Sequence, residues 1–275
     1  GGRKMSEFIV FTDLDGTLLD YKSYSFRRAL PALDVMVRRQ IAVVPVSSKT
    51  AAEMRYWMRL LSLHGPFVSE DGGGIFIPEG YFPGSISGSV NENSELRISL
   101  GEGITEAREG LKKISSEAGV AVMGFGDLKE DEVSELTGLK AAELEACMTR
   151  EYDEPFLLAD NDAAELLFEI AQKNGFSLVR GGRFFHISRG CDKGRAVEIL
   201  TELFRRLYPE VVTIGIGDSA NDLSLLQNVD HAYLVMRHDG TYDPEVSDES
   251  VRKVGGIGPH GWRMAMEEVF NVVGN

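Results

Sequence analysis

The chain has 275 residues, of which 43% are hydrophobic and 26% are charged, and its formal net charge is −14 at pH 7. This composition is typical of a globular protein with a sizeable core, arranged as one large domain or two smaller ones. The acidic balance argues against nucleic acid or an anionic membrane as a partner, because those surfaces attract clustered Lys and Arg. A phosphorylated ligand would therefore have to be held by local cations.

Cys147 and Cys191 are the only cysteines, and they offer neither a disulfide framework nor the spacing of zinc ligands. They predict two small buried side chains in a cytoplasmic protein. No apolar stretch approaches the ~18 residues that a membrane-spanning helix needs.

Short apolar runs and amphipathic patterns alternate along the two outer parts of the chain. Helices with apolar residues at i, i+3, i+4 and i+7 are expected after Thr50, a suitable N-cap, and from Asp192. Such alternation indicates a doubly wound α/β fold with a parallel sheet, whose ligands bind at the carboxyl ends of the strands. The strands are predicted at residues 8–11, 41–46, 211–216 and 232–235.

The middle of the chain has a different composition. Residues 78–94 are mostly Gly, Ser, Pro and Asn, which predicts a linker. Gly181 and Gly182 separate two extended runs at 176–180 and 183–187. This arrangement predicts a hairpin, because Gly-Gly accepts the positive φ angles of a tight two-residue turn.

Helical and extended patterns alternate through the rest of this middle region. We therefore expect an α+β insert at residues 84–188 within a parallel-sheet domain made of residues 1–83 and 189–275. Within the insert, helices are predicted at 105–118, 131–136, 140–148 and 162–173, and extended segments at 96–100, 120–123 and 155–159.

Asp13 and Asp15 directly follow the first predicted strand. Alternation along an extended chain places residues i and i+2 on the same side, so the two carboxylates would meet. A metal, a cationic side chain or a shared proton must then lie between them. Other strand and helix ends supply further polar groups, in the order Ser47, Ser48 and Lys49, then Lys193, then Asp218 and Asp222.

These segments resemble the four motifs of the haloacid dehalogenase superfamily, in the expected order: "DLDGT", the serine of "VSS", Lys193 and "GDSAND". The position and size of the insert resemble the cap of the subgroup that contains sugar phosphatases and phosphomannomutases. Dehalogenases of the superfamily lack the second aspartate, so Asp15 points to phosphoryl transfer.

The resemblance implies a role for each carboxylate. Asp13 would be the nucleophile and form an aspartyl-phosphate, and Asp15 would serve as general acid and then as general base. A carboxylate that attacks a phosphate dianion needs a divalent cation to offset the repulsion. Mg²⁺, which prefers hard oxygen ligands, would be held by Asp13, the backbone carbonyl of Asp15 and the carboxylate of Asp218.

The phosphoryl group itself needs fixed donors. Ser47 would donate a hydrogen bond to it and Lys193 would supply a positive charge. Asn221 and Asp222 would orient Lys193 and the metal-bound waters from outside the first layer of ligands.

A narrower resemblance comes from four segments: "VPVSSKT", "REYDEPF", "GGRFFH" and "GCDKGRAV" are similar to the mannosyl-3-phosphoglycerate phosphatase family. That family implies a small phosphorylated sugar-glycerate substrate and, as product, the compatible solute mannosylglycerate. In "SEDGGG", Asp71 stands where relatives usually have Asn, and it is expected to alter only a turn. The substrate's carboxylate calls for extra polar and cationic groups, for which the candidates are Ser48, Lys49, Arg150, Arg180, Arg183 and His186.

Other functions stay open at this stage. The sugar could be glucosyl instead of mannosyl, or another phosphorylated sugar could be the substrate. A phosphomutase would return the phosphoryl group to a sugar, and a catalytically silent module would only bind a phosphorylated sugar. We expect a hydrolase, acting as a monomer or homodimer.

Overall fold

The computed structural model describes residues 7–270, and its centre is a five-stranded sheet in the order β13-β12-β11-β1-β2. All neighbouring strands in it are parallel, which confirms the doubly wound fold expected from the sequence. β1 lies between β11 and β2, and its run of apolar residues is almost entirely buried, as expected of a strand covered on both faces. The strands are β1 (Phe8–Thr12), β2 (Ala42–Pro45), β11 (Val212–Gly217), β12 (His231–Met236) and β13 (Val251–Ile257).

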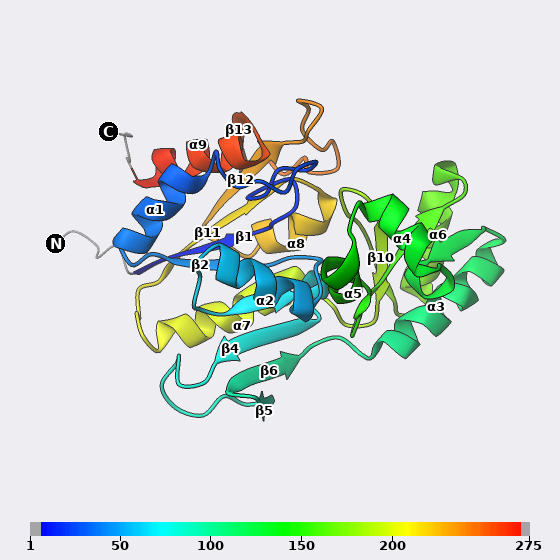
Figure 1. The fold of residues 1–275 in the computed structure, drawn as a ribbon, viewed down its shortest axis with the longest axis horizontal. Coiled ribbons are helices and arrows are strands. Elements are labelled where there is room, and N and C mark those ends of the chain that lie inside the picture. The colour runs from blue at the N-terminus through cyan, green and yellow to red at the C-terminus, as the bar shows by residue number, and fades with distance from the viewer. Residues whose placement is uncertain (1–6, 271–275) are drawn as a thin grey trace.

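Helices cover both faces of this sheet (Figure 1). Val10 and the residues that alternate with it pack against α1, α2 and α9, whereas Ile9 and Phe11 pack against α7 and α8. The helices are α1 (Leu30–Arg38), α2 (Ala51–Leu60), α7 (Lys193–Arg205), α8 (Leu223–Leu226) and α9 (Gly258–Phe270).

A second, antiparallel sheet in the order β3-β4-β6-β5 shares the core of the face that α7 covers. The linker expected at residues 78–94 is wrong in part, since β5 lies within it and pairs with β6 through a two-residue turn, Asn93-Ser94, in which both φ angles are positive. Because β6 pairs with β4, we propose that the cap begins after β6 and not at residue 84. The strands are β3 (Phe67–Ser69), β4 (Gly74–Pro78), β5 (Ser89–Glu92) and β6 (Glu95–Ser99).

The remaining inserted residues form a four-stranded antiparallel sheet, β7-β8-β10-β9, which lies beside the core in Figure 1. Helices α3 and α6 pack on this sheet, and α4 and α5 form a small cluster with Phe125 that reaches α2. The elements are β7 (Val122–Gly124), β8 (Glu154–Leu158), β9 (Ser177–Arg180), β10 (Phe185–Ser188), α3 (Ile104–Ala118), α4 (Glu130–Thr137), α5 (Ala141–Met148) and α6 (Ala164–Lys173).

The β9–β10 hairpin is confirmed, but its turn differs from the expected one. Arg180 pairs with Phe185, so the loop holds four residues, and the N–H of Gly181 donates to the carbonyl of Phe184 at 2.9 Å. Neither Gly181 nor Gly182 has a positive φ. The longer loop projects Arg183 beyond the end of the strand pair.

Cys147 and Cys191 are free and buried, as predicted. Within residues 7–270, no helix combines the length and the apolar character that crossing a bilayer requires.

Candidate active site

The predicted motif residues meet at the carboxyl edge of the central sheet. Asp13 follows β1, Ser47 lies two residues after β2, and Asp218 follows β11. The N–H of Asp13 donates to the carbonyl of Ile216 at 3.0 Å, which continues the β1–β11 ladder up to the nucleophile candidate. Parallel pairing is therefore what brings these distant segments together.

Lys193 lies in the first turn of α7, whose N-cap is Asp192, and its side chain reaches the same edge of the sheet. Its side chain is 1% exposed, and its Nζ lies 2.8 Å from Asp222, 3.3 Å from Asp13 and 3.7 Å from Asp71. Burial alone would lower the pKa of this ammonium, but the carboxylates of Asp13 and Asp222 outweigh burial and raise it. Lys193 is thus a fixed positive charge.

Asp13, Asp218 and Asp222 each offer a carboxylate oxygen within 4.8 Å of the others. Burial and the neighbouring carboxylate of Asp222 raise the pKa of Asp13 to about 7, and burial together with Asp13 raises the pKa of Asp218. Buried like charges at this spacing call for a cation between them. Asp222 already accepts the N–H groups of Asp218 and Ser219 and binds Lys193, so donors within the protein occupy its carboxylate.

Gly16 is a second indication that the space beside Asp218 could hold a cation. It has a φ of +74°, and a Cβ atom at this position would clash with Oδ2 of Asp218. The turn after the Asp-x-Asp pair therefore needs glycine both for its backbone and for its contact with a candidate metal ligand. The oxygen donors of Asp13 and Asp218 fit a divalent cation.

Ser47 and Ser48 are placed differently from each other. Ser47 is fully buried, and its Oγ accepts the N–H of Lys49 at 3.2 Å. Ser48 instead lines the cavity between core and cap.

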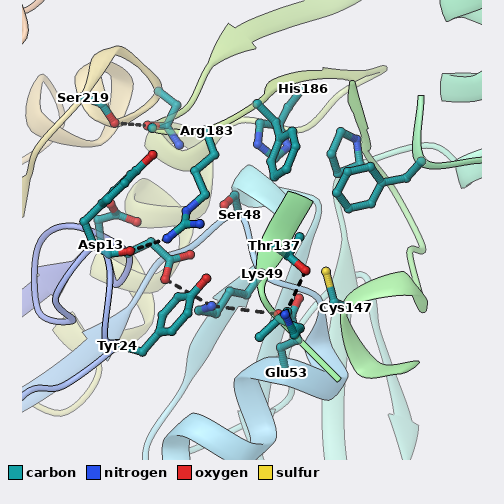
Figure 2. A pocket seen from close by; sticks show the side chains of 18 of the residues that line it. Asp13, Tyr24, Ser48, Lys49, Glu53, Thr137, Cys147, Arg183, His186 and Ser219 are labelled. Atoms are coloured by element: carbon teal, nitrogen blue, oxygen red, sulfur yellow. Dashed lines mark hydrogen bonds and ion pairs between the residues drawn. The ribbon is translucent and has the colours of Figure 1, made fainter. Parts of the chain in front are cut away.

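Asp15 is the more open carboxyl of the pair, with 36% of its side chain exposed. Its Oδ1 lies 3.2 Å from Nζ of Lys49. Figure 2 shows Lys49 pointing into the cavity beside Tyr24 and Glu53. Lys49 was expected from the sequence to contact substrate, and the structure places it against Asp15.

Asp71 belongs to the site, so the expectation that it alters only a turn is wrong. Its Oδ1 accepts a hydrogen bond from Asn221 at 3.0 Å and lies 3.7 Å from Lys193. Glu70 and Asp71 have φ angles of 49° and 57°, and their N–H groups donate to the carbonyls of Lys49 and Ser47. The signal in the sequence is an acidic pair before three glycines, where a strand ends in a left-handed turn.

Arg150 reaches from the cap into the core and is almost fully enclosed. Its side chain is 3% exposed, forms ion pairs with Asp153 and, at 3.4 Å, with Glu70, and donates to the carbonyl of Ser48 at 3.1 Å. The N–H donors of the Arg150 guanidinium are therefore engaged by groups of the protein itself.

His186 lies on β10 with Nδ1 at 2.9 Å from Asp153 and 3.5 Å from Asp71. Burial lowers the pKa of His186 to about 4, and the attraction of Asp71 does not compensate. The ring is therefore neutral near pH 7, and it lines the cavity.

Arg183 and Arg180 have different surroundings. Arg183 donates to the carbonyl of Tyr21, stacks over the Tyr21 ring at 4.4 Å, and lines the cavity (Figure 2). Within residues 7–270 it pairs with no carboxylate. Arg180 lies 4.0 Å from Glu245, is 42% exposed, and is not among the lining residues of this cavity.

The cavity joins the two parts of the chain. The core contributes the carboxyl groups of Asp13 and Asp15, and the cap contributes Arg183 and His186. Apolar and small side chains complete the cap side of the wall: Phe125, Thr137, Leu139, Cys147, Pro155 and Phe184.

Comparison with known proteins gives relatives over nearly the full chain. A glucosyl-3-phosphoglycerate/mannosyl-3-phosphoglycerate phosphatase from Methanococcoides burtonii is 41% identical over 264 residues, covering 95% of this chain and 97% of the relative. A mannosyl-3-phosphoglycerate phosphatase from Pyrococcus furiosus is 31% identical, covering 90% and 99%. No family model matches the chain.

Among solved structures, a HAD subclass IIB sugar phosphatase superposes with a TM-score of 0.67 at 13% identity, covering 96% of this chain and 99% of that one. This likeness shows a shared fold of core and cap. The identity with the two phosphatases goes further, because it extends along almost the whole length of each protein. The chain belongs to the mannosyl-3-phosphoglycerate phosphatase family, on a haloacid dehalogenase-like fold.

Proposed function

We propose that this phosphatase hydrolyses mannosyl-3-phosphoglycerate to mannosylglycerate and phosphate, with Asp13 as nucleophile. The observation that carries the proposal is the meeting of Asp13, Lys193 and Asp218 below a cavity whose cap wall presents Arg183. The same chemistry on the glucosyl ester is included, since one relative carries both names.

The proposed mechanism gives each residue of the site a separate role. An oxygen of Asp13 attacks phosphorus, the bond to the glycerate oxygen breaks, and Asp15 protonates that oxygen as it leaves. Asp15 then removes a proton from the water that attacks the aspartyl-phosphate. Lys193 and Ser47 hold the phosphoryl oxygens during both steps.

Asp13, Asp218 and the backbone carbonyl of Asp15 would hold the divalent cation, for which we propose Mg²⁺ because all three donors are oxygens. When bound, the ion offsets the repulsion between carboxylate and phosphate. The raised pKa values of Asp13 and Asp218 support this assignment, because burial and the neighbouring carboxylates raise both, in Asp13 despite the positive charge of Lys193.

Arg183 is our candidate for the carboxylate of the glycerate. The other cations of the cavity wall are occupied, Lys49 by Asp15 and Arg150 by Glu70 and Asp153. Within residues 7–270, Arg183 has a carbonyl and the rings of Tyr21 and Tyr24 as partners and no carboxylate, which leaves its charge available for an anion. The sugar would then face the apolar wall of the cap.

The test compares Arg183→Ala on two substrates. Loss of one charge-assisted hydrogen bond, worth ~1.5 to 3 kcal/mol, should lower kcat/KM for mannosyl-3-phosphoglycerate by ~10- to 150-fold. Hydrolysis of p-nitrophenyl phosphate, which has no carboxylate, should change little. Arg205→Ala on the exposed end of α7 is the matched control, since it removes an arginine paired with Glu202 far along the helix from Lys193.

Equal losses on both substrates would contradict the role of Arg183 in specificity. A phosphomutase would be recognised by transfer of labelled phosphate to a second sugar hydroxyl, and the hydrolase proposal fails if that transfer exceeds release of phosphate. Glucosyl and mannosyl esters, assayed side by side, decide the preferred sugar.

A further inference from the structure

We propose that Lys49 is a positioning residue that holds the carboxyl of Asp15 where it can transfer a proton to the leaving oxygen. This inference rests on the proposed role of Asp15 as general acid. Nζ of Lys49 lies 3.2 Å from Oδ1 of Asp15, and within residues 7–270 this is the only ion pair that Asp15 makes.

The ammonium of Lys49 is enclosed on several sides. Its side chain is 7% exposed, and Nζ lies 5.1 Å from the ring centroid of Tyr24, 5.7 Å from that of Trp57, and 3.9 Å from Glu53. The dashed lines in Figure 2 show how the ammonium bridges two acidic side chains. Aromatic faces and carboxylates together hold a cation in one place.

The backbone of Lys49 is fixed as well. Its N–H donates to Oγ of Ser47, and its carbonyl accepts the N–H of Glu70 at 2.8 Å. The next residue, Thr50, caps α2 in a reciprocal pair of hydrogen bonds with Glu53. Lys49 therefore extends from a rigid point beside the proposed phosphoryl donor Ser47.

Asp15 needs such support more than Asp13 does. It lies in a tight turn, where Gly16 has positive φ, and its carboxyl is partly open to solvent. A general acid must keep its proton within hydrogen-bond reach of the leaving oxygen, and a displacement of about 1 Å can cost about 100-fold in rate. The contact with Lys49 restricts that displacement.

Leaving-group chemistry separates this role from direct substrate binding. An alkoxide leaving group must receive a proton as its bond to phosphorus breaks, whereas p-nitrophenolate leaves without one. The constant to compare is kcat/KM, because it covers the steps up to loss of the leaving group and omits the later hydrolysis of the aspartyl-phosphate.

The experiment measures Lys49→Met and Asp15→Asn on p-nitrophenyl phosphate, ethyl phosphate and mannosyl-3-phosphoglycerate, with saturating Mg²⁺. Asp15→Asn should lose about 100-fold or more on both alkyl esters and much less on the aryl ester. Lys49→Met should show the same pattern at about 10- to 100-fold. Lys49→Arg, which keeps the positive charge, should retain more alkyl-ester activity than Lys49→Met.

Lys253→Met is the control, because Lys253 also lies over a tyrosine ring, at 5.3 Å from Tyr242, but on β13. If Lys49→Met impairs only the carboxylate-bearing substrate, Lys49 is a substrate ligand and the inference is wrong. Equal losses on all three substrates would also overturn it, since they indicate damage to fold or phosphate binding. If Asp15→Asn itself shows no dependence on the leaving group, the proposed acid fails, and with it this inference.

Discussion

Replacing Arg150 with methionine tests whether this arginine supports the structure or binds substrate. The guanidinium is buried between Glu70 and Asp153 and also binds the carbonyl of Ser48. Methionine keeps the unbranched apolar stem but lacks the guanidinium, so it leaves both carboxylates without their cation. Removing one partner of a buried ion pair costs ~3 to 5 kcal/mol, and we expect that loss in the free energy of unfolding at pH 8.

The loss should become smaller as the pH falls. Burial raises the pKa of Glu70, and the charge of Arg150 partly opposes that effect. Without the arginine, the pKa of Glu70 in the folded state rises further above its value in the unfolded chain. A carboxyl with a raised folded-state pKa favours folding more as protons become available, so the variant should recover stability towards pH 5.

Urea denaturation of the parent, Arg150→Met and Arg150→Met/Glu70→Gln at pH 5 and pH 8 measures both effects. The double variant removes one of the uncompensated charges and should recover part of the loss at pH 8. Activity should fall to a similar degree on aryl and glycosyl substrates. A free energy of unfolding within ~1 kcal/mol of the parent, together with a loss confined to mannosyl-3-phosphoglycerate, would refute the structural role.

Three further predictions concern the core and the cap histidine. Asp13→Asn and removal of divalent cations by a chelator should each abolish phosphate release, and only the second effect should reverse on adding Mg²⁺. Gly16→Ala should raise the Mg²⁺ concentration needed for half-maximal activity by ~10- to 100-fold, because its methyl group would displace Asp218. Burial lowers the pKa of His186 to about 4, so the stability tied to its neutral form is present above pH 6.5 and is lost as the pH falls towards 4. This loss amounts to ~3 kcal/mol in the free energy of unfolding. In His186→Gln, the free energy of unfolding should depend less on pH over this range.

The fold of the core could be predicted from the sequence because the patterns that indicate it lie within short segments. Continuous apolar runs predict the buried parallel strands, and polar residues at their carboxyl ends predict where Asp13 and Asp218 meet. Parallel pairing of the strands then brings these residues, which are far apart in the sequence, close together at one edge of the sheet. The roles proposed for these residues remain predictions that the variants above address.

Other features depend on contacts that no short segment reveals. β5 consists of Ser, Val, Asn and Glu and is largely exposed, so it lacks an apolar pattern and exists through its backbone pairing with β6. Arg150 meets the carbonyl of Ser48 across 102 residues of sequence. Asp71 enters the site only because two consecutive residues adopt positive φ, a conformation that its residue type permits but does not require.

Contacts between cap and core join the segments proposed to select the substrate to those proposed to carry out catalysis. Glu70 accepts the N–H groups of Glu151, Tyr152 and Asp153 at 2.9 to 3.3 Å, and its own N–H holds the carbonyl of Lys49. Arg183 holds the segment that follows the Asp-x-Asp pair, through Tyr21. The cap is therefore attached to the same loops that carry the proposed acid, its lysine and the phosphoryl donors. If Arg183 binds the glycerate carboxylate as proposed, the group that selects the substrate and the groups proposed to break the phosphate ester belong to one connected set of loops.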